Sequence, residues 1–283
     1  FEVALVCSPN HLHIPQARIL LNHGCSLFIE KPLTTDLGQV GELIRQAEKN
    51  KALFMVGCNL RFHPGVKTLK KVLRDSLLGR PLYCRAVFAH YLPNWRPGQD
   101  YRKTYSAQKL QGGGILLDAI HEPDYLCWLF GKVSKVRAHL ATIGDLEIDV
   151  EDYADYLMWH QKDFCSNVHV DYLRRDKIRS CEIVGTAGTV TWESVGKKPE
   201  QVTVRHFDAE AGRTTDLYVN ELYDLNQQYV DEIKYFLRCV SEGINPMNGL
   251  REALHTLQVI DEVRFSSESG EIQNLSHEDN NAE

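Results

Sequence analysis

The chain has 283 residues, of which 43% are hydrophobic and 25% charged, and its formal net charge is −6. This composition is typical of a globular protein with room for two domains. The acidic balance gives no basic surface for nucleic acid, and no apolar run reaches the length of a membrane span, so we expect neither nucleic acid nor membrane as a partner.

The first sixty residues alternate between strand and helix patterns. Apolar runs of strand length are separated by segments with helical periodicity, and Gly24 ends the first of these helices. This βαβαβ order predicts parallel strands joined by right-handed crossovers. The expected elements are strands at 3–7, 25–29 and 53–56 and helices at 11–23 and 36–49.

The pattern then changes. Most segments between residues 133 and 219 alternate polar and apolar residues, which is typical of antiparallel strands with one exposed face. We therefore predict the C-terminal half of a Rossmann-type parallel sheet, followed by an α+β domain with an open, mainly antiparallel sheet flanked by helices. The remaining expected elements are helices at 64–77, 223–242 and 250–266, a strand at 82–89 and an irregular loop at 92–108. The predicted domains are 1–58, 59–275 and a polar tail at 276–283.

Two segments carry ionisable groups next to apolar runs. The second strand runs directly into Glu30-Lys31-Pro32, and open α/β sheets bind ligands at the carboxyl ends of their strands. Gly112-Gly113-Gly114 leads into an apolar helix that contains Asp118, His121 and Asp124. Buried ionisable groups must be paired or take part in function, so these segments are the first candidates for an active site.

A doubly wound nucleotide-binding domain normally opens with a strand, a glycine-rich turn and a helix. The printed sequence shows no such turn and begins at what would be the fourth strand. We expect a chain that lacks the N-terminal glycine-rich part of a Rossmann domain, and hence weak or absent dinucleotide binding by residues 1–283 alone.

With these motifs in order, the chain resembles the Gfo/Idh/MocA oxidoreductases, the family of glucose–fructose oxidoreductase and inositol dehydrogenase. The resemblance covers residues 1 to about 275. It rests on Ser8-Pro9-Asn10 with His11 and His13, Glu30-Lys31-Pro32, Asn59-x-Arg61-Phe62, Trp95-Arg96, and the triple glycine leading to Asp118, His121 and Asp124.

The resemblance implies an oxidoreductase that uses NAD or NADP and acts on a sugar, a polyol, or an acidic or nucleotide-linked sugar. It implies a homodimer or homotetramer formed through the open sheet. It also implies a cis Lys31–Pro32 peptide bond, as in several relatives. The residues it assigns to the cofactor are Ser8, Pro9, Asn10, His13, Glu30, Lys31, Pro32, Asn59, Trp95 and Arg96.

Oxidising an alcohol requires a base for the hydroxyl proton and a group that stabilises the developing alkoxide. Lys31 can supply the charge, although its pKa must fall toward about 7–8 for it to act as the base. His121 needs no such shift. Asp118 could orient His121 or bind a substrate hydroxyl, but it lies three residues before His121 where the commoner family pattern has four. Pro123 predicts a helix kink beside His121.

Cations border the proposed cleft. Arg61, Arg96, Arg102 and Lys103 together suggest a substrate carboxylate or phosphate, although solvated charge is the ordinary role of each. We assign substrate contacts to Arg61, Arg102, Tyr105, Asp118, His121 and Tyr172.

Simpler roles stay open for several of these residues. Asp124 could pair with a buried arginine, and Tyr172 could form a cross-strand pair. A metal at Asp118, His121 and Asp124 is not expected, because one histidine and two carboxylates from one helix leave the shell incomplete.

Eight scattered cysteines without a Cys-x-x-Cys pair indicate reduced thiols and a cytoplasmic protein, with no zinc site and no disulfide framework. Two other functions remain open. The chain could be a catalytically silent member that binds a dinucleotide or a sugar as a regulator, or an inactive fragment of the enzyme.

Overall fold

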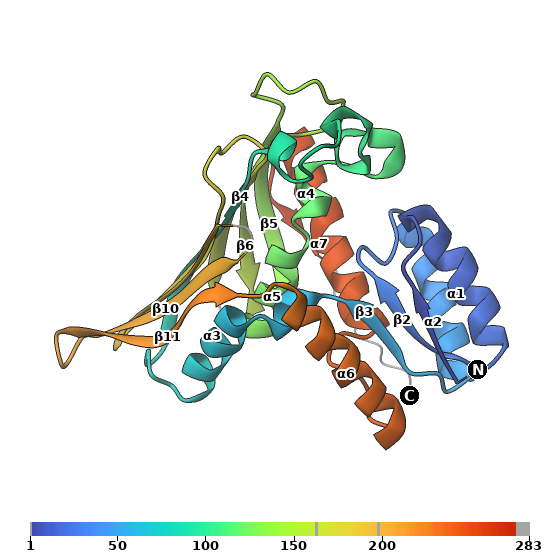
Figure 1. Cartoon of the computed structure of the whole chain (residues 1–283), viewed down its shortest axis with the longest axis horizontal. Coiled ribbons are helices and arrows are strands. Elements are labelled where there is room, and N and C mark those ends of the chain that lie inside the picture. Colours follow the sequence, from blue (N-terminus) through green and yellow to red (C-terminus); the bar gives the residue numbers. More distant parts are fainter. Residues whose placement is uncertain (1, 162–163, 197–198, 276–283) are drawn as a thin grey trace.

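A computed structural model describes residues 2–161, 164–196 and 199–275, and it contains two sheets (Figure 1). The first sheet has three parallel strands in the order β1-β2-β3. Leu27 lies opposite Ala4 on one side and Phe54 on the other. The predicted parallel sheet is confirmed, with β1 at Val3–Val6, β2 at Ser26–Glu30 and β3 at Phe54–Gly57.

The helices between these strands follow the predicted patterns. A short 3-10 turn leads into α1 (His13–Asn22), and Gly24 ends the connection with a φ of +76°, a conformation that favours glycine. A second 3-10 turn leads into α2 (Val40–Lys49). The apolar stripe of α2 is buried at Val40, Leu43, Ile44 and Ala47.

The second sheet has nine strands in the order β11-β10-β9-β8-β4-β7-β6-β5-β12. Within this second sheet, β4–β7 is the one parallel pair among the described residues, so the prediction of a mainly antiparallel sheet is confirmed. The strands are β4 (Pro81–Ala89), β5 (Val133–Ala141), β6 (Tyr153–His160), β7 (Cys165–Asp171), β8 (Ile178–Gly185), β9 (Gly188–Gly196), β10 (Glu200–Asp208), β11 (Arg213–Tyr223) and β12 (Gln273–Asn274).

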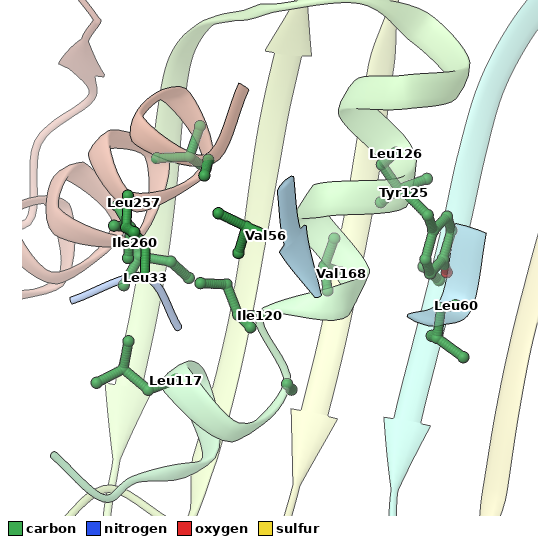
Figure 2. Packing of buried hydrophobic residues seen from close by; sticks show 14 of the residues in the cluster. Leu33, Val56, Leu60, Leu117, Ile120, Tyr125, Leu126, Val168, Leu257 and Ile260 are labelled. Atoms are coloured by element: carbon green, nitrogen blue, oxygen red, sulfur yellow. The ribbon is translucent and has the colours of Figure 1, made fainter. Parts of the chain in front are cut away.

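Helices cover one face of this sheet. They are α3 (Pro64–Arg74), α5 (His121–Phe130) and α7 (Leu250–Ser269), and α7 also reaches β3 and α2 (Figure 1). Strand β6 shows the consequence, because alternate residues from Ala154 to His160 are buried and the others are partly exposed. Figure 2 shows the shared core, in which Leu33 and Val56 lie near Ile120 and Ile260.

The helix after the triple glycine is not continuous, which corrects the sequence prediction. It divides into α4 (Ile115–Asp118) and α5, with Ala119 and Ile120 between them. Asp118 and His121 therefore lie on two helices and not one turn apart on the same helix. Pro123 lies in the first turn of α5, where a missing N–H group costs nothing.

The edge of β3 pairs with a distant segment. Val56 N–H donates to the Asn248 carbonyl, and the Asn248 side chain donates to the Val56 carbonyl, each at 2.9 Å. Asn248 lies between α6 (Asn226–Glu242) and α7, so the last part of the chain closes against the parallel sheet. None of the described helices has the length and apolar character of a membrane span. The predicted tail at 276–283 lies outside the described residues.

Candidate active site

The candidate site begins where β2 ends. The Lys31–Pro32 peptide bond is cis, as predicted. The Lys31 ammonium donates to the backbone oxygen of Asp118 at 3.4 Å, and the Glu30 carboxylate accepts the Lys31 backbone N–H at 3.1 Å. The carboxyl end of the parallel strand therefore meets the end of α4, although Lys31 and Asp118 are far apart in sequence.

The glycine-rich turn makes the close packing around α4 possible. Gly114 has a φ of +108°, and a side chain there would overlap the carboxylate of Glu151. That carboxylate accepts the backbone N–H of Leu116 at 3.2 Å, at the start of α4. The turn thus places α4 close to the loop before β6, which fixes the position of Asp118.

A cavity of about 840 Å³ opens between these elements. It brings together seven of the residues predicted for the site, and adds charged residues from β8, β10 and the start of α6. The predicted residues that line it are Lys31, Asn59, Trp95, Arg96, Tyr105, Asp118 and His121.

The pKa of Lys31 is raised above its ordinary value. Burial lowers it, but the nearby Asp118, Tyr105 and Glu30 raise it by more. The condition for Lys31 to act as the base, a pKa lowered toward about 7–8, is therefore not met in this structure, and Lys31 carries its charge at neutral pH. A permanently charged ammonium suits electrostatic stabilisation and not general-base catalysis.

His121 shows the opposite behaviour. Burial, together with the positive charges of Lys31 and Arg179, holds the pKa of the imidazole well below its ordinary value. His121 is 9% exposed, and its buried Nδ1 has no hydrogen-bond partner among the described residues. Nε2 is thus the nitrogen that a ligand can reach, and the neutral ring is able to accept a proton there.

Asp118 is 7% exposed and is held by a tyrosine. The Tyr172 hydroxyl donates to Asp118 Oδ2 at 2.6 Å. Tyr172 itself is fully buried and does not line the cavity, which corrects its predicted place on the substrate face.

Two of the predicted substrate-binding arginines lie elsewhere. Arg61 is 3% exposed and forms two hydrogen bonds with Asp124, at 2.9 and 2.7 Å, while it also donates to the Met247 carbonyl. This confirms the simpler role for Asp124, that of a partner for a buried arginine. Arg102 is exposed and pairs with Asp100 and Glu147, outside the cavity lining. Both guanidinium groups already have carboxylate partners.

The residues after β1 are placed beside this site but do not line the cavity. His13 is fully buried, and its ring nitrogens lie 2.9 Å from the Pro32 carbonyl and 2.8 Å from the Ser8 carbonyl. It therefore joins the loop after β1 to the loop after β2. Ser8 also donates from its hydroxyl to Gln16 on α1. Pro9 and Asn10 lie in the same loop, at the start of the 3-10 turn.

Sequence reasoning missed two ion pairs of the cavity wall. Arg179, on β8, lies 2.8 Å from the fully buried Glu122, and Lys177 pairs with Glu200, which also contacts His63 at 3.2 Å. These partners lie in different elements, so no local spacing could have revealed them. The alternation of β8 was the available signal, because it places Arg179 on the same face as the buried Cys181 and Ile183.

The lining residues fit the nicotinamide end of a dinucleotide. The cavity lies at the carboxyl ends of parallel strands, and the Asn59 side chain, 5% exposed, carries an oxygen without a hydrogen-bond partner among the described residues. Among the described residues there is no group of three or more His, Cys, Asp or Glu side chains that could hold a metal.

Two family descriptions match the chain. Residues 1–58 match "Oxidoreductase family, NAD-binding Rossmann fold", and residues 66–191 match "GFO/IDH/MocA C-terminal domain".

Curated relatives are named for sugar and polyol chemistry. Myo-inositol 2-dehydrogenase of Thermotoga maritima is 26% identical over 254 residues, which is 87% of this chain and 71% of the relative. 2,7-Anhydro-N-acetylneuraminate hydratase of Mediterraneibacter gnavus is 29% identical over 157 residues, 53% of this chain and 40% of the relative. Levoglucosan dehydrogenase of Pseudarthrobacter phenanthrenivorans is 33% identical over 144 residues, 50% of this chain and 36% of the relative.

Solved structures share the fold. A levoglucosan dehydrogenase in complex with NADH has a TM-score of 0.85 at 20% identity, covering 98% of this chain and 80% of that chain. An aldose–aldose oxidoreductase from Caulobacter crescentus, complexed with glycerol, has a TM-score of 0.82 at 20% identity and covers 97% of this chain and 79% of that one.

Proposed function

Because the chain belongs to the Gfo/Idh/MocA family of NAD-binding oxidoreductases, we propose that it transfers hydride between NAD or NADP and a carbon that bears a hydroxyl group. The substrate is a sugar or polyol, or an acidic or nucleotide-linked sugar. One observation carries the proposal: Lys31, Asp118 and His121 line a single cavity at the end of the parallel sheet.

The pKa shifts of Lys31 and His121 have opposite directions, and we assign the two residues different roles on that basis. Lys31 stays charged and stabilises the alkoxide that develops as the hydroxyl proton leaves. His121 stays neutral and accepts that proton at Nε2. Asp118 holds the ammonium of Lys31 through its backbone oxygen. The cofactor, when bound, supplies the group that takes up or delivers the hydride.

The cofactor residues predicted from the sequence are kept in this proposal, with two changes of role. Asn59 and Trp95 line the cavity, and we assign them to the nicotinamide end; Arg96 also lines it, and we assign it to the substrate. His13 acts indirectly, because both of its ring nitrogens face backbone carbonyls. The loop and strand-end residues Ser8, Pro9, Asn10, Glu30 and Pro32 complete the proposed cofactor site.

Arg96 and Tyr105 are the proposed substrate contacts at the cavity mouth. The Arg96 guanidinium lies 5.1 Å from the centre of the Tyr105 ring, and it forms no ion pair among the described residues. Arg96 is therefore free to bind a substrate carboxylate or phosphate, whereas the cations of β8 are already paired. This replaces the sequence prediction that Arg61 and Arg102 bind the substrate.

The remaining proposals concern assembly and location. The face of the nine-stranded sheet that carries no helices is the proposed surface for a homodimer or homotetramer (Figure 1). No disulfide bond joins the cysteines of the described residues, which supports a reducing cytoplasm.

The test is a titration of NADH and NADPH, followed by turnover assays at saturating cofactor with neutral polyols and their uronic acids. None of the described parallel strands β1–β3 is followed by a glycine-rich turn that could hold the pyrophosphate, so we expect affinity weaker than micromolar. We also expect turnover that the Lys31→Met variant loses. Cofactor binding without turnover of any substrate would favour the regulator, and sub-micromolar affinity would contradict the expected weakness.

A further inference from the structure

Tyr172 follows the last residue of β7 and does not line the cavity. It is fully buried, and its hydroxyl donates to Asp118 Oδ2 at 2.6 Å. Asp118 lines the cavity and Tyr172 does not. Tyr172 cannot reach a ligand in the cavity, but it forms a hydrogen bond with Asp118, which can. Any effect of Tyr172 on the reaction therefore passes through Asp118.

The backbone on both sides fixes the place of this tyrosine. Tyr172 N–H donates to the Asp152 carbonyl at 2.8 Å, and the Tyr172 carbonyl accepts from Leu92 N–H at 3.0 Å. The preceding Asp171 accepts the N–H groups of Leu173 and Arg174 at 2.7 and 2.8 Å. The chain on either side of Tyr172 is therefore anchored before any side-chain contact is considered.

The ring is held as firmly as the backbone. Trp95 packs edge-on against it, with ring centres 5.2 Å apart. Burial, and next the negative charge of Asp118, hold the pKa of the phenol well above its ordinary value, so Tyr172 remains a hydrogen-bond donor throughout the physiological range. One carboxylate oxygen of Asp118 is thus permanently engaged, and Oδ1 is left for the cavity.

We propose that Tyr172 is a positioning residue of the reaction: its hydroxyl fixes the Asp118 carboxylate, and thereby the end of α4 whose backbone oxygen holds the Lys31 ammonium. This inference rests on the proposed oxidoreductase function. It gives Tyr172 a task that the sequence did not suggest, since the sequence indicated either a residue of the substrate face or a member of a cross-strand pair.

Two other buried tyrosines show that this contact is not a general consequence of burial. The hydroxyls of Tyr125 and Tyr156 are buried and have no hydrogen-bond partner among the described residues. Tyr156, on β6, does not line the cavity and belongs to no part of the proposed site. Tyr156→Phe is therefore a matched control, because it removes a buried phenol oxygen without removing a hydrogen bond.

The experiment compares Tyr172→Phe and Tyr156→Phe by urea unfolding and by steady-state kinetics. We expect Tyr172→Phe to lower kcat by about 10- to 100-fold and to change KM by less than about threefold. The reason is that the substitution displaces the Asp118 carboxylate and the Lys31 ammonium but removes neither. Tyr156→Phe should leave both parameters unchanged. A matching loss of kcat in both variants, or an unchanged kcat and pH profile in Tyr172→Phe, would overturn the proposal.

A double-mutant cycle with Asp118→Ala works without a known substrate, because alanine removes the oxygen that accepts the Tyr172 hydroxyl. If Tyr172 holds Asp118, Tyr172→Phe lowers the urea midpoint in the wild-type background and much less in the Asp118→Ala background. Equal shifts in the two backgrounds would overturn the proposal even if no substrate is found. A wild-type chain that turns over no substrate, but shows this coupling, would instead contradict the oxidoreductase function and leave the contact established.

Discussion

Arg61 and Asp124 are as deeply buried as Asp118 and His121, yet the two sets have different surroundings. Arg61 is 3% and Asp124 1% exposed, and they satisfy each other with two hydrogen bonds. Asp118 and His121 are 7% and 9% exposed, but they line a cavity, and neither side chain forms an ion pair among the described residues. Burial alone therefore does not mark a functional charge. A place on the wall of a cavity without an ion-pair partner is the additional sign.

The comparison predicts that the buried pair of Arg61 and Asp124 matters for stability, whereas the charged residues that line the cavity matter for the reaction. Lys31 belongs to the cavity residues, and Lys31→Met has the largest expected effect. Removing the charge that stabilises the alkoxide should lower kcat/KM by at least about 1,000-fold, or about 4 kcal/mol of transition-state stabilisation. The free energy of unfolding should change by less than about 1 kcal/mol, because the cost of burying the ammonium offsets much of its attraction to Asp118 and Glu30, and its hydrogen bond to a backbone oxygen is long. Activity within tenfold of wild type would contradict the role of Lys31.

Asp124→Ala tests the first set. It leaves the Arg61 guanidinium buried without its carboxylate, and breaking such a pair costs about 3–5 kcal/mol of unfolding free energy. Urea unfolding measures this loss. The matched variant Asp231→Ala breaks a largely exposed pair with Lys67 nearby, and should cost less than about 1 kcal/mol. Equal losses of unfolding free energy in the two variants would show that burial does not determine how much these two ion pairs contribute to stability.

The pH dependence of turnover sharpens the comparison within the cavity. His121 must be neutral to accept a proton, and its pKa lies well below the ordinary value. We expect kcat/KM to stay level as the pH falls from about 8 through about 6.5, and to decline only at lower pH. Arg179→Gln removes one of the positive charges that depress this pKa, so its acid limb should move to higher pH. An acid limb already centred near the ordinary histidine pKa in the wild type would contradict the neutral-base assignment.

The sequence predicted the sheets because alternation and helical periodicity are local properties. The stripe of α2 and the parallel strands β1–β3 appeared where the patterns placed them. The division between α4 and α5 was not predicted, because Ala119 and Ile120 are compatible with a continuous helix and only the packing around them interrupts it. A kink was predicted, but it was assigned to Pro123.

The candidate site was predictable in part for the same reason. Lys31, Asp118 and His121 could be identified because each lies beside an apolar run, where a charge is unusual. The partners of charges could not be identified, since Arg61 pairs with a residue 63 positions away and Arg179 with a residue of another element. Choosing which arginine faces a ligand requires knowing which arginines are already paired.

Arg102 and Arg96 give the smallest expected effect and test that last point directly. Arg102 is exposed and paired with Asp100 and Glu147, so Arg102→Ala should change the free energy of unfolding by less than about 1 kcal/mol and leave KM unchanged. Arg96→Ala should raise KM for an acidic sugar by about tenfold, because a charge-assisted hydrogen bond is worth about 1.5–3 kcal/mol. The same variant should leave KM for a neutral polyol nearly unchanged. If Arg102→Ala raised KM while Arg96→Ala did not, the substrate would bind at the outer loop, and the comparison between paired and open charges would fail at the cavity mouth.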